Sequence, residues 1–386
     1  MHQRAQLTVG GEVSRGSIPA ASIEVQDNGR PSVAGVRETK AVSIPLGDGV
    51  FSSAWLSSVL EDSPHWPHGA LRVLKVSRIG TEHGLSGQIH RVVAETKHGG
   101  SRSFVVKQES AAAVGRELLF RSHCGGLVRG CIPDLFCGVT DAGAERGVLV
   151  LEDITPAEQG DVLHGCTDDE AGAVVRVLAR LHGGSWNVTA DATAGVPRWS
   201  AQPMEPDRWR DRLARATERF PGILERIVEP LVDVPERVAD AGSLLSQGPA
   251  SWLHVDAHLD NTLLRPDGTV VLLDWCNAAI GPPAIDLARF LIEGVVESSQ
   301  PERVTALLSI YANELRAGVE GVALSELETG FELALLPLVQ GAVGWAGRHE
   351  LEQNGRSAAL CENFLRSACG WALRDESGSQ HGGKAP

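Results

Sequence analysis

Asn261 and Asp274 bracket a segment whose pattern predicts a β-hairpin. Two apolar runs, 262–264 and 269–273, flank a Pro-Asp-Gly sequence that is typical of a tight turn. Because paired strands lie about 4.8 Å apart, the side chains of Asn261 and Asp274 should emerge close together at the open end of the hairpin. An amide oxygen and a carboxylate are hard ligands of the kind that Mg²⁺ prefers. The spacing therefore indicates a magnesium site.

Asp256 precedes Asn261 by five residues, in the loop that leads into this hairpin. It would stand beside the metal without being needed as a ligand. Phosphoryl transfer requires a base there, or an acceptor that orients the attacking hydroxyl. Taken singly, an Asp or Asn at a hairpin is usually a cap or a turn former. Together, at this spacing, Asp256, Asn261 and Asp274 favour phosphoryl transfer.

The same residues carry a resemblance to a known family. His254, Asp256 and Asn261 match a catalytic loop of the form H-x-D-x-x-x-x-N. Asp274 is followed by Trp where protein kinases have D-F-G, and residues 281–288 are G-P-P-A-I-D-L-A. The chain thus resembles the aminoglycoside phosphotransferase and choline kinase-like family of small-molecule kinases, with features of its ecdysteroid-kinase-like branch, over about residues 52–375. The resemblance implies a bilobal, protein-kinase-like α+β fold, with an antiparallel sheet plus a helix in the N-lobe and a larger, mostly helical C-lobe.

The resemblance also implies roles for individual residues. Asp256 would handle the acceptor hydroxyl, while Asn261 and Asp274 would hold Mg²⁺. Asp286 would buttress the catalytic loop from the following helix. Val255 departs from the family, which often has Gly at this place, but the difference should not touch the chemistry.

A glycine turn between two predicted strands is the candidate phosphate-binding loop. Strand-like runs at 71–79 and 89–95 flank Gly84-Leu-Ser86-Gly87. The backbone N–H groups of Gly84, Ser86 and Gly87 would approach the phosphates of ATP. The motif lacks the full G-x-G-x-x-G, and such a turn is often a plain hairpin. Its place one strand before a lysine favours the phosphate-binding interpretation.

Lys107 ends a third strand-like run, 103–107, of the V-A-I-K type, whose lysine binds the α- and β-phosphates in kinases. Most lysines at strand ends are simply solvated. A helical pattern then begins around Glu117, the candidate partner that holds Lys107 in place as in kinases. Glu109 is the alternative partner, but it would need a reversed turn.

The run 147–154 predicts a buried strand that ends in Leu-Glu-Asp. It resembles the hinge between the lobes in this family, where backbone groups near Leu151 and Asp153 would hold the adenine edge. A buried strand without ligand contacts is the alternative. With Lys107 and Glu117, these residues would complete an ATP site, and GTP remains an alternative nucleotide.

Beyond the hinge, the apolar period changes to that of helices. Thr167 to Glu170 is a capping-box sequence, and the helix that follows ends near His182. His182 matches the family's L-A-x-L-H and fits a packed core residue better than a catalyst. Further helices are predicted at 208–218, 222–232, 283–296, 304–317, 324–345 and 358–373. Pro337 should kink or break 324–345 into more than one element.

Four segments follow from these patterns. We assign residues 1–50 to a disordered or loosely attached N-terminal tail and 51–153 to an N-lobe that binds ATP. Residues 154–375 would form the helical C-lobe with the catalytic loop and the acceptor site, and 376–386 a C-terminal tail.

The composition limits the partners. The 386 residues carry a net charge of −14, which would repel nucleic acid. This charge is compatible with a cationic substrate, although a solvated acidic surface is its commoner cause. No apolar run approaches the length of a membrane span and no signal peptide is evident, so we expect a cytoplasmic protein without a membrane partner. The seven cysteines are scattered without a C-x-x-C pair and should be reduced thiols.

The predicted reaction is an ATP- and Mg²⁺-dependent phosphoryl transfer to a hydroxyl group of a small molecule. An antibiotic is the leading acceptor; choline, homoserine, a sugar or a natural-product intermediate are alternatives, and so is a nucleotide-binding pseudokinase. Protein acceptors are excluded because Gly281 follows Asp274 too closely for a peptide-docking loop. Candidate acceptor contacts, for which solvent exposure or core packing is the alternative, are Asp168, Asp169, Glu205, Asp207, Trp186, Trp199 and Trp209.

Overall fold

The computed structural model describes residues 43–61, 63, 65–66, 68–80, 88–141, 143–189, 195–294, 301–349 and 355–372. All of them belong to one unit of the fold. The predicted phosphate-binding turn with Gly84, Ser86 and Gly87 lies outside the described residues, as do most of the predicted N-terminal tail and the whole C-terminal tail.

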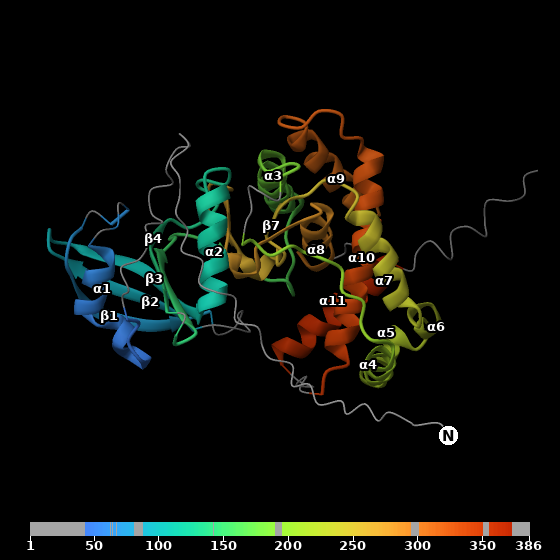
Figure 1. Cartoon of the computed structure of the whole chain (residues 1–386), viewed down its shortest axis with the longest axis horizontal. Coiled ribbons are helices and arrows are strands. Elements are labelled where there is room, and N and C mark those ends of the chain that lie inside the picture. The colour runs from blue at the N-terminus through green and yellow to red at the C-terminus, as the bar shows by residue number, and fades with distance from the viewer. Residues whose placement is uncertain are drawn as a thin grey trace, which may run out of the picture. The chain divides into compact units, whose positions relative to one another are not determined.

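The first half of the described chain forms a five-stranded antiparallel sheet with the strand order β1-β2-β3-β5-β4 (Figure 1). Its strands are β1 (Leu71–Ile79), β2 (Gln88–Thr96), β3 (Ser101–Ser110), β4 (Leu135–Asp141) and β5 (Arg146–Glu152). The three strands predicted before Lys107 and the strand predicted at the hinge are all present. Strand β5 lies between β3 and β4, so its backbone is paired on both sides.

Alternation along β5 explains how helices cover both faces of this sheet. Val148 and Val150 belong to the apolar cluster that includes α1 (Ser53–Leu60), whereas Leu149 and Leu151 pack with Val114 of α2 (Ala111–Cys124). Figure 1 shows α1 and α2 on opposite sides of the strands.

Part of the segment assigned to the N-terminal tail also packs against the sheet. A 3-10 helix, η1, spans Gly47–Phe51, and Ile44 and Val50 are buried in the same cluster as α1. Arg146 donates hydrogen bonds to the carbonyls of Ile44 and Pro45. The packed chain therefore begins before the predicted boundary at residue 50.

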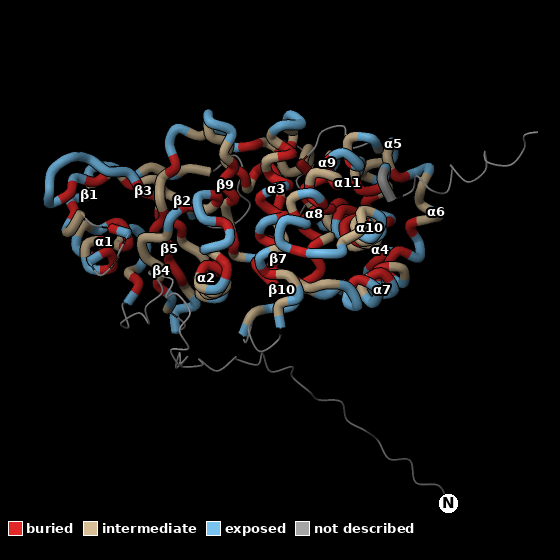
Figure 2. The backbone as a smooth tube through the Cα atoms, turned by 90° about the horizontal axis from the view of Figure 1, so that it is seen from above, coloured by how far each residue is buried: buried red, intermediate tan, exposed pale blue. Residues whose placement is uncertain are grey.

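The second half is mainly helical, as the change of apolar period predicts. The helices are α3 (Asp168–Gly184), α4 (Pro206–Arg219), α5 (Pro221–Leu224), α6 (Val228–Leu231), α7 (Val234–Leu245), α8 (Ala284–Gly294), α9 (Pro301–Leu315), α10 (Leu324–Ala346) and α11 (Arg356–Ala372). Helix α3 begins at the predicted capping box, since Thr167 and Glu170 cap each other's backbone N–H groups. Buried residues concentrate along α3, α8 and the neighbouring short strands (Figure 2).

The predicted helices differ from the structure in three places. The predicted helix 222–232 is divided into α5 and α6, helix α7 was not predicted, and α10 is continuous. The structure has a single helix, α10, where Pro337 was expected to divide the segment 324–345. Proline removes one backbone donor from the helix, but α10 is held along its length. Its buried apolar side chains, from Phe331 to Ala346, belong to the main apolar core of the helical half.

Three short pairings of strands lie inside the helical half. Strand β7 (Ser251–Leu253) pairs with β10 (Ala279–Gly281), and β6 (Glu158–Gln159) joins the hairpin of β8 (Thr262–Leu264) and β9 (Val270–Leu272).

Two further expectations concern the thiols and the helices. All seven cysteines are free thiols, as predicted. No helix in the described part of the chain has the length and apolarity to span a membrane.

Candidate active site

The predicted hairpin brings Asn261 and Asp274 to one cavity. Thr262 pairs with Leu272 in the β8–β9 ladder, and the N–H of Leu273 donates to the carbonyl of Asn261 over 2.8 Å. Asn261 therefore precedes the first strand and Asp274 follows the second, as the sequence predicts. Both line a cavity of about 600 Å³, which lies within the usual size of small-molecule sites.

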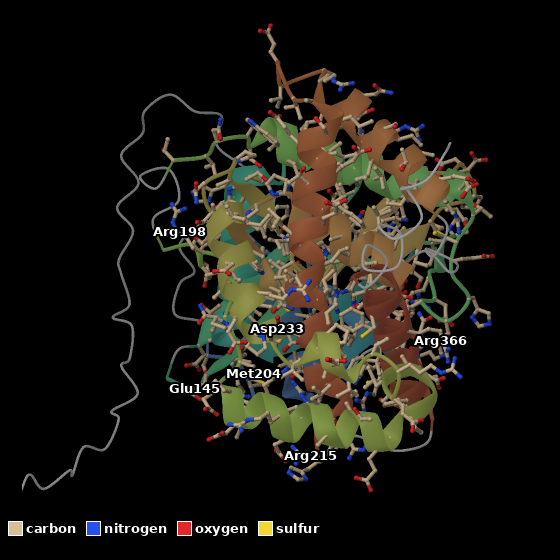
Figure 3. All side chains as sticks on the ribbon, turned by 90° about the vertical axis from the view of Figure 1, so that its right-hand side faces the viewer. Glu145, Arg198, Met204, Arg215, Asp233 and Arg366 are labelled. Atoms are coloured by element: carbon tan, nitrogen blue, oxygen red, sulfur yellow. The ribbon has the colours of Figure 1, made fainter. Side chains whose placement is uncertain are left out.

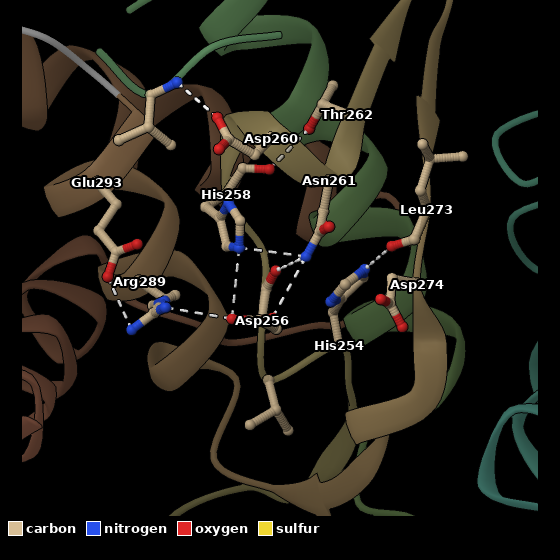
Figure 4. A network of polar contacts seen from close by, with 12 residues as sticks. His254, Asp256, His258, Asp260, Asn261, Thr262, Leu273, Asp274, Arg289 and Glu293 are labelled. Atoms are coloured by element: carbon tan, nitrogen blue, oxygen red, sulfur yellow. Dashed lines mark hydrogen bonds and ion pairs between the residues drawn. The ribbon is translucent and has the colours of Figure 1, made fainter. Parts of the chain in front are cut away.

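Asp256 lies in the same cavity, and its carboxylate is held by polar neighbours (Figure 4). Oδ1 accepts from Nη2 of Arg289 over 3.2 Å and lies 3.5 Å from Nε2 of His258. Oδ2 lies 3.4 Å from Nδ2 of Asn261, which also donates to the backbone carbonyl of Asp256 over 3.0 Å. Burial opposes ionisation, but the hydrogen bond from His258 and the charge of Arg289 outweigh it and hold the pKa of Asp256 well below its usual range. Asp256 is thus a fixed carboxylate.

Asp286 supports the loop that carries Asp256, in the way the family resemblance implied. It is fully buried, and its two oxygens accept the backbone N–H groups of His254 and Val255, each over 2.6 Å. Nε2 of His182 lies 3.3 Å from Oδ2, and Nδ1 of His182 lies 2.8 Å from the hydroxyl of Tyr311. His182 is fully buried in this network, as expected of a core histidine.

The loop that Asp286 supports has an unusual backbone dihedral angle at Val255. Its φ is +70°, in the left-handed region that β-branched residues rarely adopt. The bonds from Asp286 to the N–H groups on both sides of this turn help to hold it. The glycine that related kinases often have at this place would adopt the same φ without strain.

Lys107 is paired with Asp274 across the cavity. Its Nζ lies 2.6 Å from Oδ1 of Asp274, and the lysine side chain is buried. Burial opposes the charged form of Lys107, but the nearby carboxylates of Glu117 and Asp274 raise the pKa of its ammonium group. Burial likewise opposes ionisation of Asp274, yet the charge of Lys107 and a hydrogen bond from Cys276 lower the pKa of its carboxyl. Both groups are therefore charged at neutral pH.

The predicted ion pair between Lys107 and Glu117 is replaced by a different pairing. Oε1 of Glu117 accepts two hydrogen bonds from Arg121, over 2.8 and 3.1 Å, and Arg121 also donates to the carbonyl of Pro133. Arg121 stands four residues after Glu117 on α2, the spacing at which two side chains meet on one helical face. Both carboxylate and guanidinium are buried and line the cavity, so Glu117 acts on Lys107 through its charge rather than through a direct contact.

The hinge residues Leu151 and Asp153 also line the cavity. The carboxylate of Asp153 is taken up by Arg91, over 2.8 and 3.0 Å, and by the hydroxyl of Ser103. The side chain of Asp153 is therefore structural. The prediction that this segment holds the adenine edge then depends on its backbone groups. Apolar side chains from β1, β2 and β3, namely Ile79, Ile89 and Val105, line the cavity with Leu151.

The free oxygens of this arrangement fit a magnesium ion. The three hydrogen-bond contacts that the described residues make with the Asn261 side chain use its amide nitrogen, Nδ2, which orients the side-chain carbonyl away from Asp256 and His258. Oδ1 of Asp274 accepts from Lys107 and from the N–H of Cys276, which leaves Oδ2 without a hydrogen bond among the described residues. The described part of the chain contains no cluster of three or more His, Cys, Asp or Glu suited to a metal. One amide and one carboxylate are instead the sparse donor set of Mg²⁺ sites completed by phosphate.

Several cavity residues were missed by the sequence interpretation. His258 and Arg289 contact Asp256, and Trp345, Arg348 and Leu360 line the cavity from the last two helices. Two of them stood in or next to recognised motifs: His258 lies inside the catalytic-loop motif, two residues after Asp256, and Arg289 directly follows the motif at 281–288. No local pattern marked the other three.

The acceptor contacts proposed from the sequence do not line this cavity. Asp168 pairs with Arg303, Glu205 caps α4, and Asp207 pairs with Arg210. Trp209 is buried and donates to the carbonyl of Leu231. Asp169, Trp186 and Trp199 lie elsewhere as well. Asp169 lies in the first turn of α3, and the three tryptophans pack in or against the apolar core.

Comparison with known proteins identifies the family of the chain. A family model described as "Phosphotransferase enzyme family" matches residues 83–322, more than half of the chain. The chain therefore belongs to the phosphotransferase enzyme family, and the protein is a small-molecule phosphotransferase. No curated protein matches the chain.

Solved structures share the fold. A protein from Ralstonia eutropha JMP134, provisionally named an aminoglycoside phosphotransferase, is 14% identical with a TM-score of 0.52, over 83% of this chain and 96% of that one. A spectinomycin phosphotransferase in complex with ADP and spectinomycin is 13% identical with a TM-score of 0.50, over 79% and 94%. These likenesses confirm the predicted bilobal, protein-kinase-like α+β fold.

Proposed function

We propose that the protein transfers the γ-phosphoryl group of ATP to a hydroxyl group of a small molecule in the cytoplasm. The observation that carries this proposal is the meeting of Lys107, Asp256, Asn261 and Asp274 in one cavity of the size of a nucleotide site. In this proposal, residues 51–153 bind the nucleotide and residues 154–375 supply the catalytic loop and the acceptor site.

Each residue has a distinct part in the reaction. The ammonium group of Lys107 neutralises phosphate charge, and Glu117 reinforces its charge from α2. Asn261 and Asp274 would hold Mg²⁺, which when bound stabilises negative charge on the phosphate oxygens. The apolar side chains around Leu151 would enclose the base of the nucleotide, for which GTP is the alternative to ATP.

Asp256 orients the acceptor. Its low pKa makes it a weak base, so it accepts a hydrogen bond from the hydroxyl group and receives the proton only as the new bond to phosphorus forms. Its contacts with Arg289 and Asn261 fix the direction of that hydrogen bond. Catalysis then comes mainly from positioning and charge stabilisation.

An antibiotic is the first acceptor class to examine, and the protein would then confer resistance by phosphorylating it. A metabolic or biosynthetic acceptor would use the same machinery, and so would choline, homoserine or a sugar. A pseudokinase is disfavoured because all four groups named above are present with charges and contacts suited to transfer.

The test is release of ADP from Mg²⁺-ATP across a panel of hydroxylated antibiotics and metabolites. One compound or class should stimulate release, and Lys107→Met should lower kcat/KM for ATP by about 10²-fold, the usual value of one charged group that stabilises a transition state. Chelation of Mg²⁺ should stop release, and excess Mg²⁺ should restore it. Failure of Mg²⁺-ATP to bind would refute the proposal.

The pH profile provides an independent check on Asp256. Because the folded pKa of its carboxyl is depressed, kcat/KM should show no acidic limb from Asp256 above about pH 5. Arg289→Gln removes a positive charge that favours the carboxylate, so it should move the acidic limb to higher pH. The same change at Arg366, exposed on α11, should leave the profile unaltered. Coincident profiles for Arg289→Gln and the wild type would contradict the assignment.

A further inference from the structure

The cavity continues past Asp256 into a region lined by the last helices of the chain. Arg289 and Glu293 come from α8, Trp345 and Arg348 from the end of α10 and the residues after it, and Leu360 from α11. This region, the acceptor end, lies on the side of Asp256 that is formed entirely by the helical half. In the proposed reaction, the molecule that receives the phosphoryl group binds in the acceptor end.

Each carboxylate of the acceptor end already has a basic partner. Arg289 donates to Asp256 over 3.2 Å and lies 2.7 Å from Oε1 of Glu293 (Figure 4). Asp260 is paired with Arg356 over 2.7 Å and also accepts the backbone N–H of Val162. Burial in addition raises the pKa of Glu293, because the charges of Arg289 and His258 only partly offset it. Among the described residues, no carboxylate of the acceptor end is left to balance an ammonium group.

An apolar wall faces these paired charges. Trp345 and Leu360 line the cavity, and Phe364 follows Leu360 by one helical turn on the same face of α11. The guanidinium carbon of Arg289 lies 5.0 Å from the centre of the Phe364 ring, which is within the range of a cation–π contact. Helix α11 thus holds Arg289 in place and presents an apolar surface beside it.

The exposed side chain of Arg348 lines the same end of the cavity. It adds a positive charge, whereas the net charge of the whole chain is −14. At physiological salt, exposed charges are screened beyond about 8 Å, so the groups inside the cavity decide selectivity more than the distant surface does. Among the residues that the structure describes, a ligand with several ammonium groups would meet Arg289 and Arg348 without unpaired carboxylates to compensate its charge.

We propose that the acceptor is a neutral or anionic hydroxyl compound with an apolar ring face, and that polycations such as aminoglycosides are excluded. Trp345 and Leu360 pack against the ring face, Arg348 attracts negative charge, and the locked pairs around Arg289 leave Asp256 free only for the hydroxyl group. This inference rests on the proposed function and narrows its acceptor class.

The aromatic anion 1-anilinonaphthalene-8-sulfonate is the probe for the acceptor end. Its fluorescence is titrated against the full chain saturated with Mg²⁺-ADP, so that the nucleotide end is occupied. We expect one saturable site. Trp345→Ala should weaken binding at least about tenfold, because apolar packing is lost. Arg348→Glu should weaken it about threefold or more, the order of an exposed ion pair.

Arg366→Glu is the matched charge control. Arg366 lies on α11 at the surface of the helical half (Figure 3), paired with Glu362 and outside the cavity. This variant should bind the probe as the wild type does. Kanamycin, a polycation, should neither displace the probe nor give heat in a calorimetric titration.

The outcomes separate the two proposals. If Mg²⁺-ADP does not bind in a thermal-shift assay, the proposed function fails, and the inference about the acceptor, which rests on it, is overturned with it. If Mg²⁺-ADP binds but the probe does not, or if Trp345→Ala and Arg348→Glu bind it unchanged, the inference is overturned. Saturable binding of kanamycin that displaces the probe also overturns it.

Discussion

Replacing Asp256 with asparagine should lower kcat for acceptor-dependent release of ADP by about 10²–10⁴-fold, the usual contribution of a positioned proton acceptor. Asparagine keeps the size of the side chain and can still contact Arg289 and Asn261, so the loop should keep its shape. It removes the negative charge that receives the hydroxyl proton. The affinity for Mg²⁺-ATP should stay near that of the wild type, because Asp256 is not among the proposed ligands of the metal.

The measurement is steady-state release of ADP with an active acceptor, together with nucleotide binding and urea unfolding of the same sample. Asp267→Asn is the matched control: it makes the same change in the exposed turn of the β8–β9 hairpin, where Asp267 accepts the N–H of Thr269. It should retain full activity. An Asp256→Asn variant that responds to the acceptor as the wild type does would show that another group performs this step.

The parts of the site that could be predicted are those fixed by local sequence. The hairpin from Asn261 to Asp274 follows from two apolar runs and a turn signal, and its register sets both side chains at one end. The support of the loop by Asp286 followed from the family resemblance. Residues that are close in sequence can adopt only a few relative positions, so their placement could be predicted.

The parts that could not be predicted depend on packing between distant segments. Lys107 could pair with Glu117 or with Asp274, and only the placement of α2 and Arg121 decides between them. The acceptor end depends on how α8, α10 and α11 meet, and each of those helices shows only an ordinary amphipathic pattern. The acidic residues proposed as acceptor contacts had no local signal to separate a functional role from a helix cap.

Removing the carboxylate of Asp286 should lower both stability and activity. Asp286→Ala leaves the N–H groups of His254 and Val255 buried without their acceptors, and it also deprives His182 of a partner. Breaking a buried, charged network of this kind costs about 3–5 kcal/mol. The strain at Val255 adds to the effect, because the turn at φ +70° loses the bonds that hold it.

The two aspartates can be told apart by measuring urea unfolding and kcat on both variants. Asp256→Asn should lose activity with little loss of stability, whereas Asp286→Ala should lose both. Tyr311→Phe is the control for the network, since it removes only the far hydrogen bond to His182 and should cost about 1 kcal/mol with near-normal kcat. If Asp286→Ala unfolded at the same urea concentration as Tyr311→Phe, the loop would be held by its own packing. The role of Asp286 would then be limited to the core around His182.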